Sequence, residues 1–243
     1  MKKQILMLLV GICGIVNAQN VSLNWAKSIG SSNSDKGYSI AVDASGNVYT
    51  AGIFKGTVDF DPGSGTTNLT SAGNDDAFIS KLDASGNFIW AKSFGGTGVD
   101  LANSIFIDAI GNLYVTGAFQ GTVDFDPGSS TNNLTSIGSP DAFIIKLSGS
   151  GNFIWAKQFG GTIRATGNSI KVDATGSVYT TGFFEGTVDF DPGSGTTNFT
   201  SINIGDAFIS KLDGSGNFIW AKQLGGTSGT QPSSIFVDAT GNV

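Results

Sequence analysis

The residues with the clearest chemical potential are pairs of aspartates that recur three times along the chain. Each pair belongs to the octapeptide Gly-Thr-Val-Asp-Phe-Asp-Pro-Gly, which begins at residues 56, 121 and 186. Two carboxylates one residue apart, followed by a loop rich in backbone carbonyls, bring several oxygens near one point, and Ca²⁺ binds about 6–8 oxygen ligands. The candidate calcium ligands are therefore Asp59, Asp61, Asp124, Asp126, Asp189 and Asp191.

A structural interpretation of the same pattern stays open beside the calcium hypothesis. Asp side chains often accept hydrogen bonds from backbone N–H groups just ahead of them, and here they would cap a Pro-Gly turn in an exposed hairpin. The loop also lacks the third acid and the closing glutamate of an EF-hand. Apart from Ca²⁺, we expect no cofactor.

The paired carboxylates could also act as acid and base in glycoside hydrolysis. That chemistry needs two carboxyl groups whose environments separate their pKa values, whereas near-identical repeats offer near-identical environments. Asp100, Arg164 and Glu185 break the symmetry of the repeats, but we interpret each as an isolated charge on a solvated surface. We therefore expect no catalytic residue and no enzymatic activity in this chain.

The aspartates recur because the whole chain repeats with a step of 65 residues. Four tryptophans keep the same step, which indicates a repeat protein, and we expect them to be packing anchors between repeats. Each repeat contains four apolar segments, which span 38–43, 47–54, 76–82 and 87–94 in the first copy and which we call a, b, c and d. Asp-x-Ser-Gly-Asn turns join a to b and c to d, with the glycine at the positive-φ position. The tryptophans are Trp25, Trp90, Trp155 and Trp220.

Segments b, c and d carry apolar residues on both faces, so each sheet needs a neighbour on both sides. Four-stranded antiparallel sheets arranged around an axis meet this need. We therefore predict an all-β chain, a β-propeller with one four-stranded blade per 65-residue repeat, present as an incomplete arc of about three and a half blades that is truncated at its C-terminus. The expected parts are a signal peptide (1–18), a propeller region (19–243) with a lone d strand (19–30), three blades (37–96, 102–161, 167–226) and the start of another (232–243).

The N-terminus has the features of a secretory signal peptide. A basic start is followed by an apolar run over 5–16, and small residues precede a cleavage site after Ala18. The run is too short to span a bilayer comfortably. A lipoprotein, with Cys13 as the lipidated residue, is the alternative, but Ile12 is bulky for the position before such a cysteine. Both interpretations place the mature chain outside the cytoplasm, without membrane insertion.

The amino-acid composition excludes several kinds of catalytic and binding site. The chain has no histidine, and its one cysteine lies within the leader, so the mature chain has no disulfide, thiol nucleophile or histidine base. Lys2 and Lys3 leave with the leader, so 11 basic residues face 19 acidic ones and the net charge becomes −8. An acidic surface disfavours nucleic acid and anionic membranes as partners.

Several motifs together resemble a known repeat family. They are Asn-Val-Tyr-Thr-Ala-Gly from residue 47, Asp-Ala-Phe-Ile-Ser-Lys-Leu from 76, Gly-Asn-Phe-Ile-Trp-Ala-Lys from 86 and Phe-Gly-Gly from 94. With their copies, they resemble the SBBP repeats of secreted or surface-exposed bacterial proteins. The resemblance implies a fold similar to seven-bladed propellers and an extracellular location. It implies no catalytic residues.

The connection from b to c is unusually long, at 55–75 in the first copy. Long connections in repeat proteins collect on the binding face, and this one reads as an extra hairpin. We therefore expect a ring of hairpins that contacts an extracellular protein or a glycan as a non-enzymatic scaffold. The alternative is the propeller part of a secreted carbohydrate-active enzyme whose catalytic residues lie in a missing C-terminal region.

The signal-peptide hypothesis predicts a defined mature N-terminus. When the complete chain is expressed in a bacterium with an active secretion pathway, we expect exported protein that begins at Gln19, because the small residues before it suit signal peptidase. Intact mass and N-terminal sequencing measure this directly. Exported protein that retains residues 1–18 would contradict the prediction, and a lipid mass on Cys13 would favour the lipoprotein alternative.

Overall fold

The computed structural model describes residues 23–202, 204–238 and 240–243, and the predicted signal peptide (1–18) lies outside them. These residues form 16 β-strands and no helix. They therefore contain no helical segment that could span a membrane. The first eight strands are β1 (Lys36–Val42), β2 (Val48–Asp59), β3 (Asn68–Leu82), β4 (Phe88–Phe94), β5 (Leu101–Ile107), β6 (Leu113–Phe119), β7 (Thr122–Asp124) and β8 (Asn133–Thr135). The others are β9 (Asp141–Leu147), β10 (Phe153–Gly161), β11 (Arg164–Val172), β12 (Val178–Glu185), β13 (Thr187–Asp189), β14 (Asn198–Thr200), β15 (Asp206–Leu212) and β16 (Phe218–Leu224).

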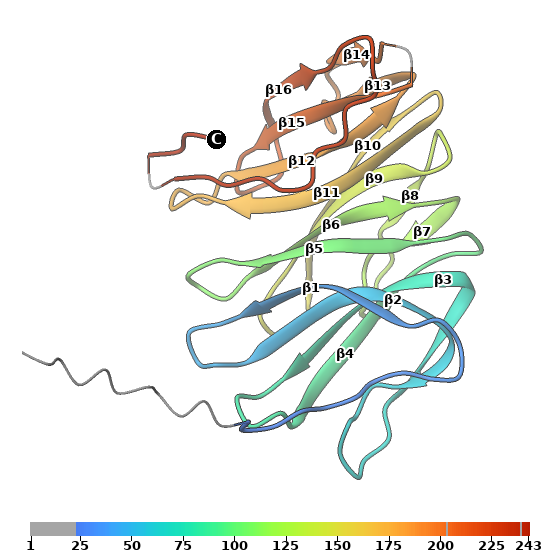
Figure 1. Ribbon diagram of the computed structural model, residues 1–243, viewed down its shortest axis with the longest axis vertical. Helices are drawn as coiled ribbons and strands as arrows, with labels where there is room; N and C mark the ends of the chain where they lie inside the picture. Colours follow the sequence, from blue (N-terminus) through green and yellow to red (C-terminus); the bar gives the residue numbers. More distant parts are fainter. Residues whose placement is uncertain (1–22, 203, 239) are drawn as a thin grey trace, which may run out of the picture.

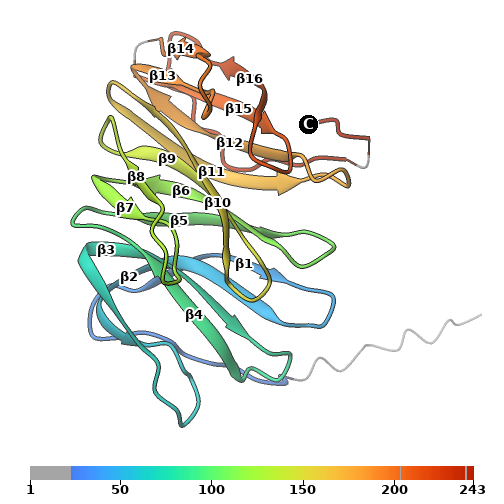
Figure 2. The same cartoon turned by 180° about the vertical axis from the view of Figure 1, so that it is seen from behind.

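Each repeat folds into one four-stranded antiparallel blade, as predicted. The blades are β1-β2-β3-β4, β5-β6-β9-β10 and β11-β12-β15-β16, so in each one the order of strands in space follows the order in the chain. The blades follow one another along the long axis of the molecule, from the blue N-terminal blade to the red C-terminal one (Figure 1). The view from behind shows the same succession (Figure 2). The all-β, propeller-like fold is therefore confirmed.

The long connection between b and c forms the extra hairpin that its length predicts. In the first blade it continues β2 and β3, where Thr57 pairs with Thr70 and Asp59 pairs with Asn68. In the second and third blades, short strands form the same hairpin as β7–β8 and β13–β14. The hairpin of the third blade also joins the second blade, because β10 pairs with β13.

A ring of three phenylalanines fixes each hairpin to its blade. In the first blade Phe60, from the hairpin, packs edge-on against Phe54 of β2 with ring centroids 5.4 Å apart, and it lies 5.0 Å from Phe78 of β3. Phe60 and Phe54 are fully buried. Aromatic pairs at such distances stabilise a core beyond the area that they bury. The same packing recurs around Phe125 and Phe190.

Two kinds of contact join neighbouring blades. The hydroxyl of Ser39 accepts a hydrogen bond from the backbone N–H of Ile105 in the next blade, and Ser104 and Ser169 repeat this contact. The indole N–H of Trp25 donates to the carbonyl of Ala84, and the corresponding bond runs from Trp155 to Gly214. These bonds confirm that Trp25 and Trp155 are packing anchors between repeats.

The two ends of the chain differ from the prediction. Residues 23–30, expected to form a d strand, and residues 232–243, expected to begin a further blade, contain no strand among the described residues. Both segments still occupy the positions of their repeats, because Trp25 contacts the first blade and Ile235 donates to Ser169 of the third. A d segment forms its ladder with a c strand of the same blade, and the described residues provide none beside 23–30.

The Gly-Gly pair at the end of each d strand, which follows Phe in the first two blades and Leu224 in the third, leaves room for a buried carboxylate. Asp76 opens the c part of β3 and is buried, and a Cβ atom on Gly95 would overlap with its carboxyl group. The relation repeats between Asp141 and Gly160 and between Asp206 and Gly225. A glycine is therefore required here for close packing against the acid, and not for an unusual backbone angle.

This packing predicts that Gly95→Ala destabilises the chain. Relief of the overlap requires movement of a buried carboxylate or of strand β4, and overpacking of this kind costs about 1–3 kcal/mol. Gly226→Ala is the matched control, since a Cβ there meets no atom within 4 Å, and we expect a change within about 0.5 kcal/mol. Urea denaturation measures both free energies of unfolding. Equal stability of the two variants would refute the packing argument.

Candidate functional site

The hairpin aspartates lie where the sequence analysis places them, at the base of each hairpin tip. In the first copy Asp59 Oδ1 accepts hydrogen bonds from the backbone N–H groups of Asp61 (3.0 Å) and Thr67 (2.8 Å). Asp61 Oδ1 accepts one from Gly63 N–H (2.8 Å). The alternation of the motif places Val58 and Phe60 inside and the two carboxylates at the partly exposed surface.

The other two copies reproduce this geometry, but the three pairs stay apart because each belongs to its own hairpin. The pair Asp124 and Asp126 and the pair Asp189 and Asp191 accept the same three backbone hydrogen bonds. The structure thus brings the two acids of each repeat together and does not assemble all six. In the described ranges, no three His, Cys, Asp or Glu side chains gather closely enough to hold a metal ion.

Hydrogen bonds to these carboxylates define their part in the loop. The loop N–H groups point at Asp59 and Asp61, so they stabilise a charged acceptor at a turn. A calcium loop instead turns carbonyl oxygens toward the ion. The turn interpretation thus has direct geometric support, and the calcium assignment stays a prediction.

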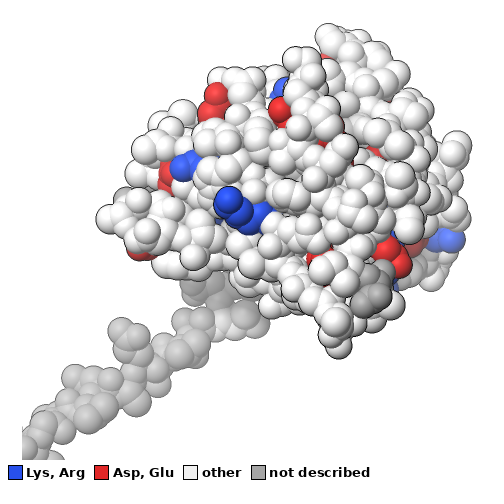
Figure 3. All heavy atoms as spheres, turned by 90° about the horizontal axis from the view of Figure 1, so that it is seen from above, with Lys and Arg blue, Asp and Glu red and all other residues white. Residues whose placement is uncertain are grey.

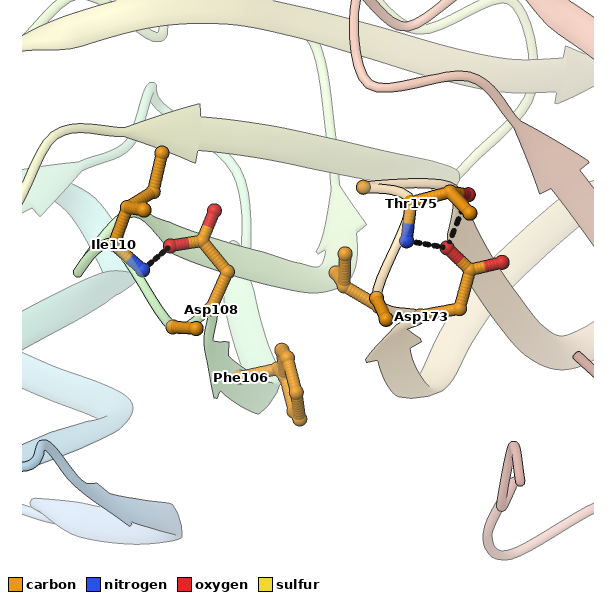
Figure 4. Close-up of a pocket in the computed structure, with 9 residues that line it drawn as sticks. Phe106, Asp108, Ile110, Asp173 and Thr175 are labelled. Carbon is orange, nitrogen blue, oxygen red and sulfur yellow. Dashed lines mark hydrogen bonds between the residues drawn. The ribbon is translucent and has the colours of Figure 1, made fainter. Parts of the chain in front are cut away.

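Grooves lie on another face of the blades, between the turns that join a to b. One of about 410 Å³ lies between the turns of the second and third blades and is lined by Phe106, Ile110, Val172 and Thr175, among others. Figure 4 shows Asp108 and Asp173 in this groove, each with its carboxylate directed at its own turn. A similar groove of about 400 Å³ lies between the first two turns.

The carboxylates of the turn aspartates in these grooves already accept hydrogen bonds from backbone and side-chain donors. Asp173 accepts from the backbone N–H groups of Thr175 and Ser177 and from the Tyr179 hydroxyl. Burial raises the pKa of Asp173, but the hydrogen bonds from Thr175, Ser177 and Tyr179 outweigh it, so the pKa lies below its ordinary value. The lowered pKa keeps this carboxylate charged at neutral pH, in a structural role.

Charged groups are sparse on the surface. Figure 3 shows single red and blue side chains scattered over a mostly uncharged face. Arg164 and Glu185, expected to be isolated, form an ion pair of 2.8 Å across β11 and β12, so that expectation is wrong. Their pairing depends on strand register, which places residues far apart in the sequence opposite each other.

Asp100 also differs from its expected role as a solvated charge. It is 1% exposed, and its carboxylate accepts from the backbone N–H groups of Gly96 (2.8 Å) and Gln120 (2.9 Å). Burial raises the pKa of Asp100 in spite of these bonds. The residue therefore connects the loop before β5 to the end of β6.

Sequence reasoning missed the buried acids that open each c segment. Burial, and to a lesser extent the charge of Asp100, raise the pKa of Asp76 to about 6, against the hydrogen bond from Ala72 N–H. Burial also raises the pKa of Asp141. A signal was present, since each acid precedes a Gly-Gly pair at constant spacing. The buried set is Asp76, Asp141 and Asp206.

The calcium hypothesis predicts about three ions per mature chain, one for each hairpin. Titration calorimetry should then show heat with Ca²⁺, and the melting temperature should rise with Ca²⁺ and not with Mg²⁺, because an ion that binds only the folded state stabilises it. The triple variant Asp61→Asn, Asp126→Asn, Asp191→Asn keeps an oxygen acceptor for each turn and removes the charge, so it should lose both effects. Absence of heat and of a thermal shift in the unmodified chain would leave these residues with the turn role alone.

Comparisons with known proteins agree with this architecture. The β-propeller repeat family SBBP matches residues 24–52. An uncharacterised WD repeat-containing protein of Acanthamoeba polyphaga mimivirus is 25% identical over 237 residues, which cover 87% of this chain and 17% of that protein. The regulatory protein FlaEY of Caulobacter vibrioides is 28% identical over 142 residues, which cover 57% of this chain and 14% of that protein.

The chain thus spans less than a fifth of the length of these relatives. A crystal structure of a protein of unknown function from Bacteroides caccae aligns with a TM-score of 0.27 and 13% identity, over 78% of this chain and 82% of that one. The matched SBBP segment runs from the first tryptophan into β2, and its pattern returns with the 65-residue step. The chain therefore contains a segment that matches the SBBP β-propeller repeat, within an all-β fold of repeated four-stranded blades.

Proposed function

We propose that this chain is a secreted or cell-surface scaffold that binds an extracellular protein or glycan, without catalysis, through its row of hairpins. The observation that carries the proposal is the threefold recurrence of one hairpin with a buried base and an exposed tip. Phe60 and Val58 hold the base in the blade, while residues 63–66 are exposed. Exposed connections on a rigid repeat scaffold are where binding residues concentrate.

The composition of the exposed hairpin strands supports a polar ligand. Thr57 and Thr70 face each other with their hydroxyls 2.9 Å apart, and the pair recurs in both other hairpins. Beside them stands an exposed asparagine in every copy, and no hydrogen bond engages its side-chain amide in the described structure. An amide and a hydroxyl both donate and accept, which suits glycan hydroxyls or the backbone of a protein loop. The asparagines are Asn68, Asn133 and Asn198.

The acidic balance of the chain supports the choice of partner class. An acidic, sparsely charged surface gives no electrostatic attraction to nucleic acid or to anionic lipid. The long relatives are consistent with a scaffold that forms one part of a larger protein. We therefore assign binding to the hairpin row and place no reaction on it.

The proposal predicts that the hairpin asparagines contribute to binding. The mature chain is applied to an array of extracellular glycans and to purified surface proteins, and any ligand found is titrated against variants. The triple variant Asn68→Ala, Asn133→Ala, Asn198→Ala should weaken binding by about tenfold or more, because each lost polar contact costs about 1 kcal/mol, while the melting temperature stays unchanged.

A control on the turns from c to d separates the hairpin row from the rest of the surface. Ser85, Ser150 and Ser215 are also exposed and repeat with the same step. Their joint replacement by alanine should leave the affinity unchanged. Weakening by the serine variant, with no effect of the asparagine variant, would move the site away from the hairpins.

A further inference from the structure

The junction between the first and second blades contains two buried carboxylates from different parts of the fold. Asp76 opens the c part of β3 and is 2% exposed, and Asp100 precedes β5 and is 1% exposed. The backbone joins their segments directly, because Asp100 N–H donates to the carbonyl of Asp75 at 2.8 Å. Two acids without water around them are costly to charge together.

The two carboxylates differ in how many of their oxygens accept a hydrogen bond. Asp100 uses both oxygens, one for Gly96 N–H and one for Gln120 N–H, and so connects the first blade to the end of β6. Asp76 Oδ2 accepts from Ala72 N–H at 2.8 Å, whereas its Oδ1 is buried without a hydrogen-bond partner. An unpaired buried oxygen favours the protonated form of its carboxyl group, since a hydroxyl is less costly to bury than a charge.

In the part of the chain that the structure describes, neither carboxylate forms an ion pair with a lysine or arginine. The charges of Asp100 and Asp75 both raise the pKa of Asp76. Lys55 is the ladder partner of Asp75 between β2 and β3. Gly95, which lies against Asp76, and Gln120, whose N–H donates to Asp100, carry no charge.

The next junction is a natural comparison, because it lacks one of the two acids. Asp141 repeats Asp76, but Ala165 stands where Asp100 would be, and its N–H makes the same bond, to the carbonyl of Pro140 at 2.8 Å. Compared with the β5–β6 ladder, the β11–β12 ladder extends by two pairs, Ala165 with Phe184 and Arg164 with Glu185. The second junction is therefore held by backbone pairing and an ion pair, with a single buried carboxylate.

We propose that the Asp76–Asp100 pair makes the first junction a pH-sensitive contact, which tightens in mild acid and loosens when both carboxylates are charged. A folded-state pKa above the unfolded value means that the folded junction binds more protons. Its stabilisation is therefore present at low pH and is lost as the pH rises through about 6, the pKa of Asp76. Turn aspartates such as Asp43, whose pKa is lowered, act in the opposite sense and only below their ordinary value of 3.8.

Hydrogen exchange tests the proposal on the complete mature chain. The amides of Ala72, Gly96 and Gln120 report the first junction, because they donate to the two carboxylates. After correction for intrinsic exchange, we expect their opening to increase by about tenfold between about pH 5 and about pH 7.5, which corresponds to about one pKa unit of coupling. The amide of Gly216, bonded to Asp213 in a turn, is the reference without this dependence.

Two substitutions exchange the properties of the junctions. Asp100→Ala gives the first junction the residue of the second, and it should weaken the pH dependence there to that of a single buried acid. Ala165→Asp gives the second junction the missing acid, and it should steepen the pH dependence that buried Asp141 gives to the amides of Ile137 and Gly161. An unchanged slope in Asp100→Ala, or no steeper slope in Ala165→Asp, would overturn the proposal. If Asp100→Ala does not fold, Ala165→Asp and Asp76→Asn decide it, since Asp76→Asn should also remove the slope.

Discussion

The structure depends on the burial of each blade's faces against its neighbours. The effect of a neighbour is visible in one repeated position, since Ile105 and Ile170 are 5% and 0% exposed, whereas Ile40, with no described blade before it, is 66% exposed. The serine hydroxyl of one blade accepts from the N–H of this isoleucine in the next, at 3.2–3.3 Å. Apolar burial supplies the stabilisation, and the hydrogen bond fixes the register between blades.

Close contact between blades buries backbone polar groups, and these groups need hydrogen-bond partners. The repeats provide such partners in two ways. At the first junction the carboxylate of Asp100 accepts from Gln120 N–H, in place of a further rung of the ladder. At the second, Ala165 has no such side chain, and the ladder itself continues to the Arg164–Glu185 pair. Both solutions keep the same backbone hydrogen bond, from residue 100 to residue 75 and from residue 165 to residue 140, at 2.8 Å. The carboxylate solution places a second buried titratable group at the contact, beside Asp76.

Much of this architecture could be predicted from the sequence. The 65-residue period, the Asp-Gly turns and the length of the connection between b and c led to the blades, their strand order and the hairpins. Local chemistry suffices for these features, since Asp43 and its counterparts cap turns within five residues. The outer segments were predicted as strands although strand formation needs a partner that the described residues do not offer.

The buried carboxylates could not be predicted in the same way. The local sequence around an acid at the start of an apolar segment is the same whether its carboxylate faces water or packs against a glycine of the next strand. Asp76 is buried because Gly95 lies over it and because β4 brings that glycine back. Asp100 is buried where the loop after β4 and the end of β6 meet, and its carboxylate accepts from Gly96 and Gln120 there. The burial of both is thus a property of packing between strands and between blades, and one sequence without structure shows only the constant spacing of the acid and the glycine.

In each hairpin, the residues that anchor it to the blade are different from the residues that are exposed at its tip. Phe60 and its neighbours fill the blade, and Asp59 receives a backbone N–H from residue 67, so neither contribution depends on the side chains at the tip. The second copy shows this independence, because Asn132 replaces Thr67 and still donates its backbone N–H at 2.8 Å. Tip residues can therefore change from repeat to repeat without loss of the hairpin. A surface with that freedom, held on a rigid and repeated base, can be adapted to a ligand while the fold beneath it stays constant.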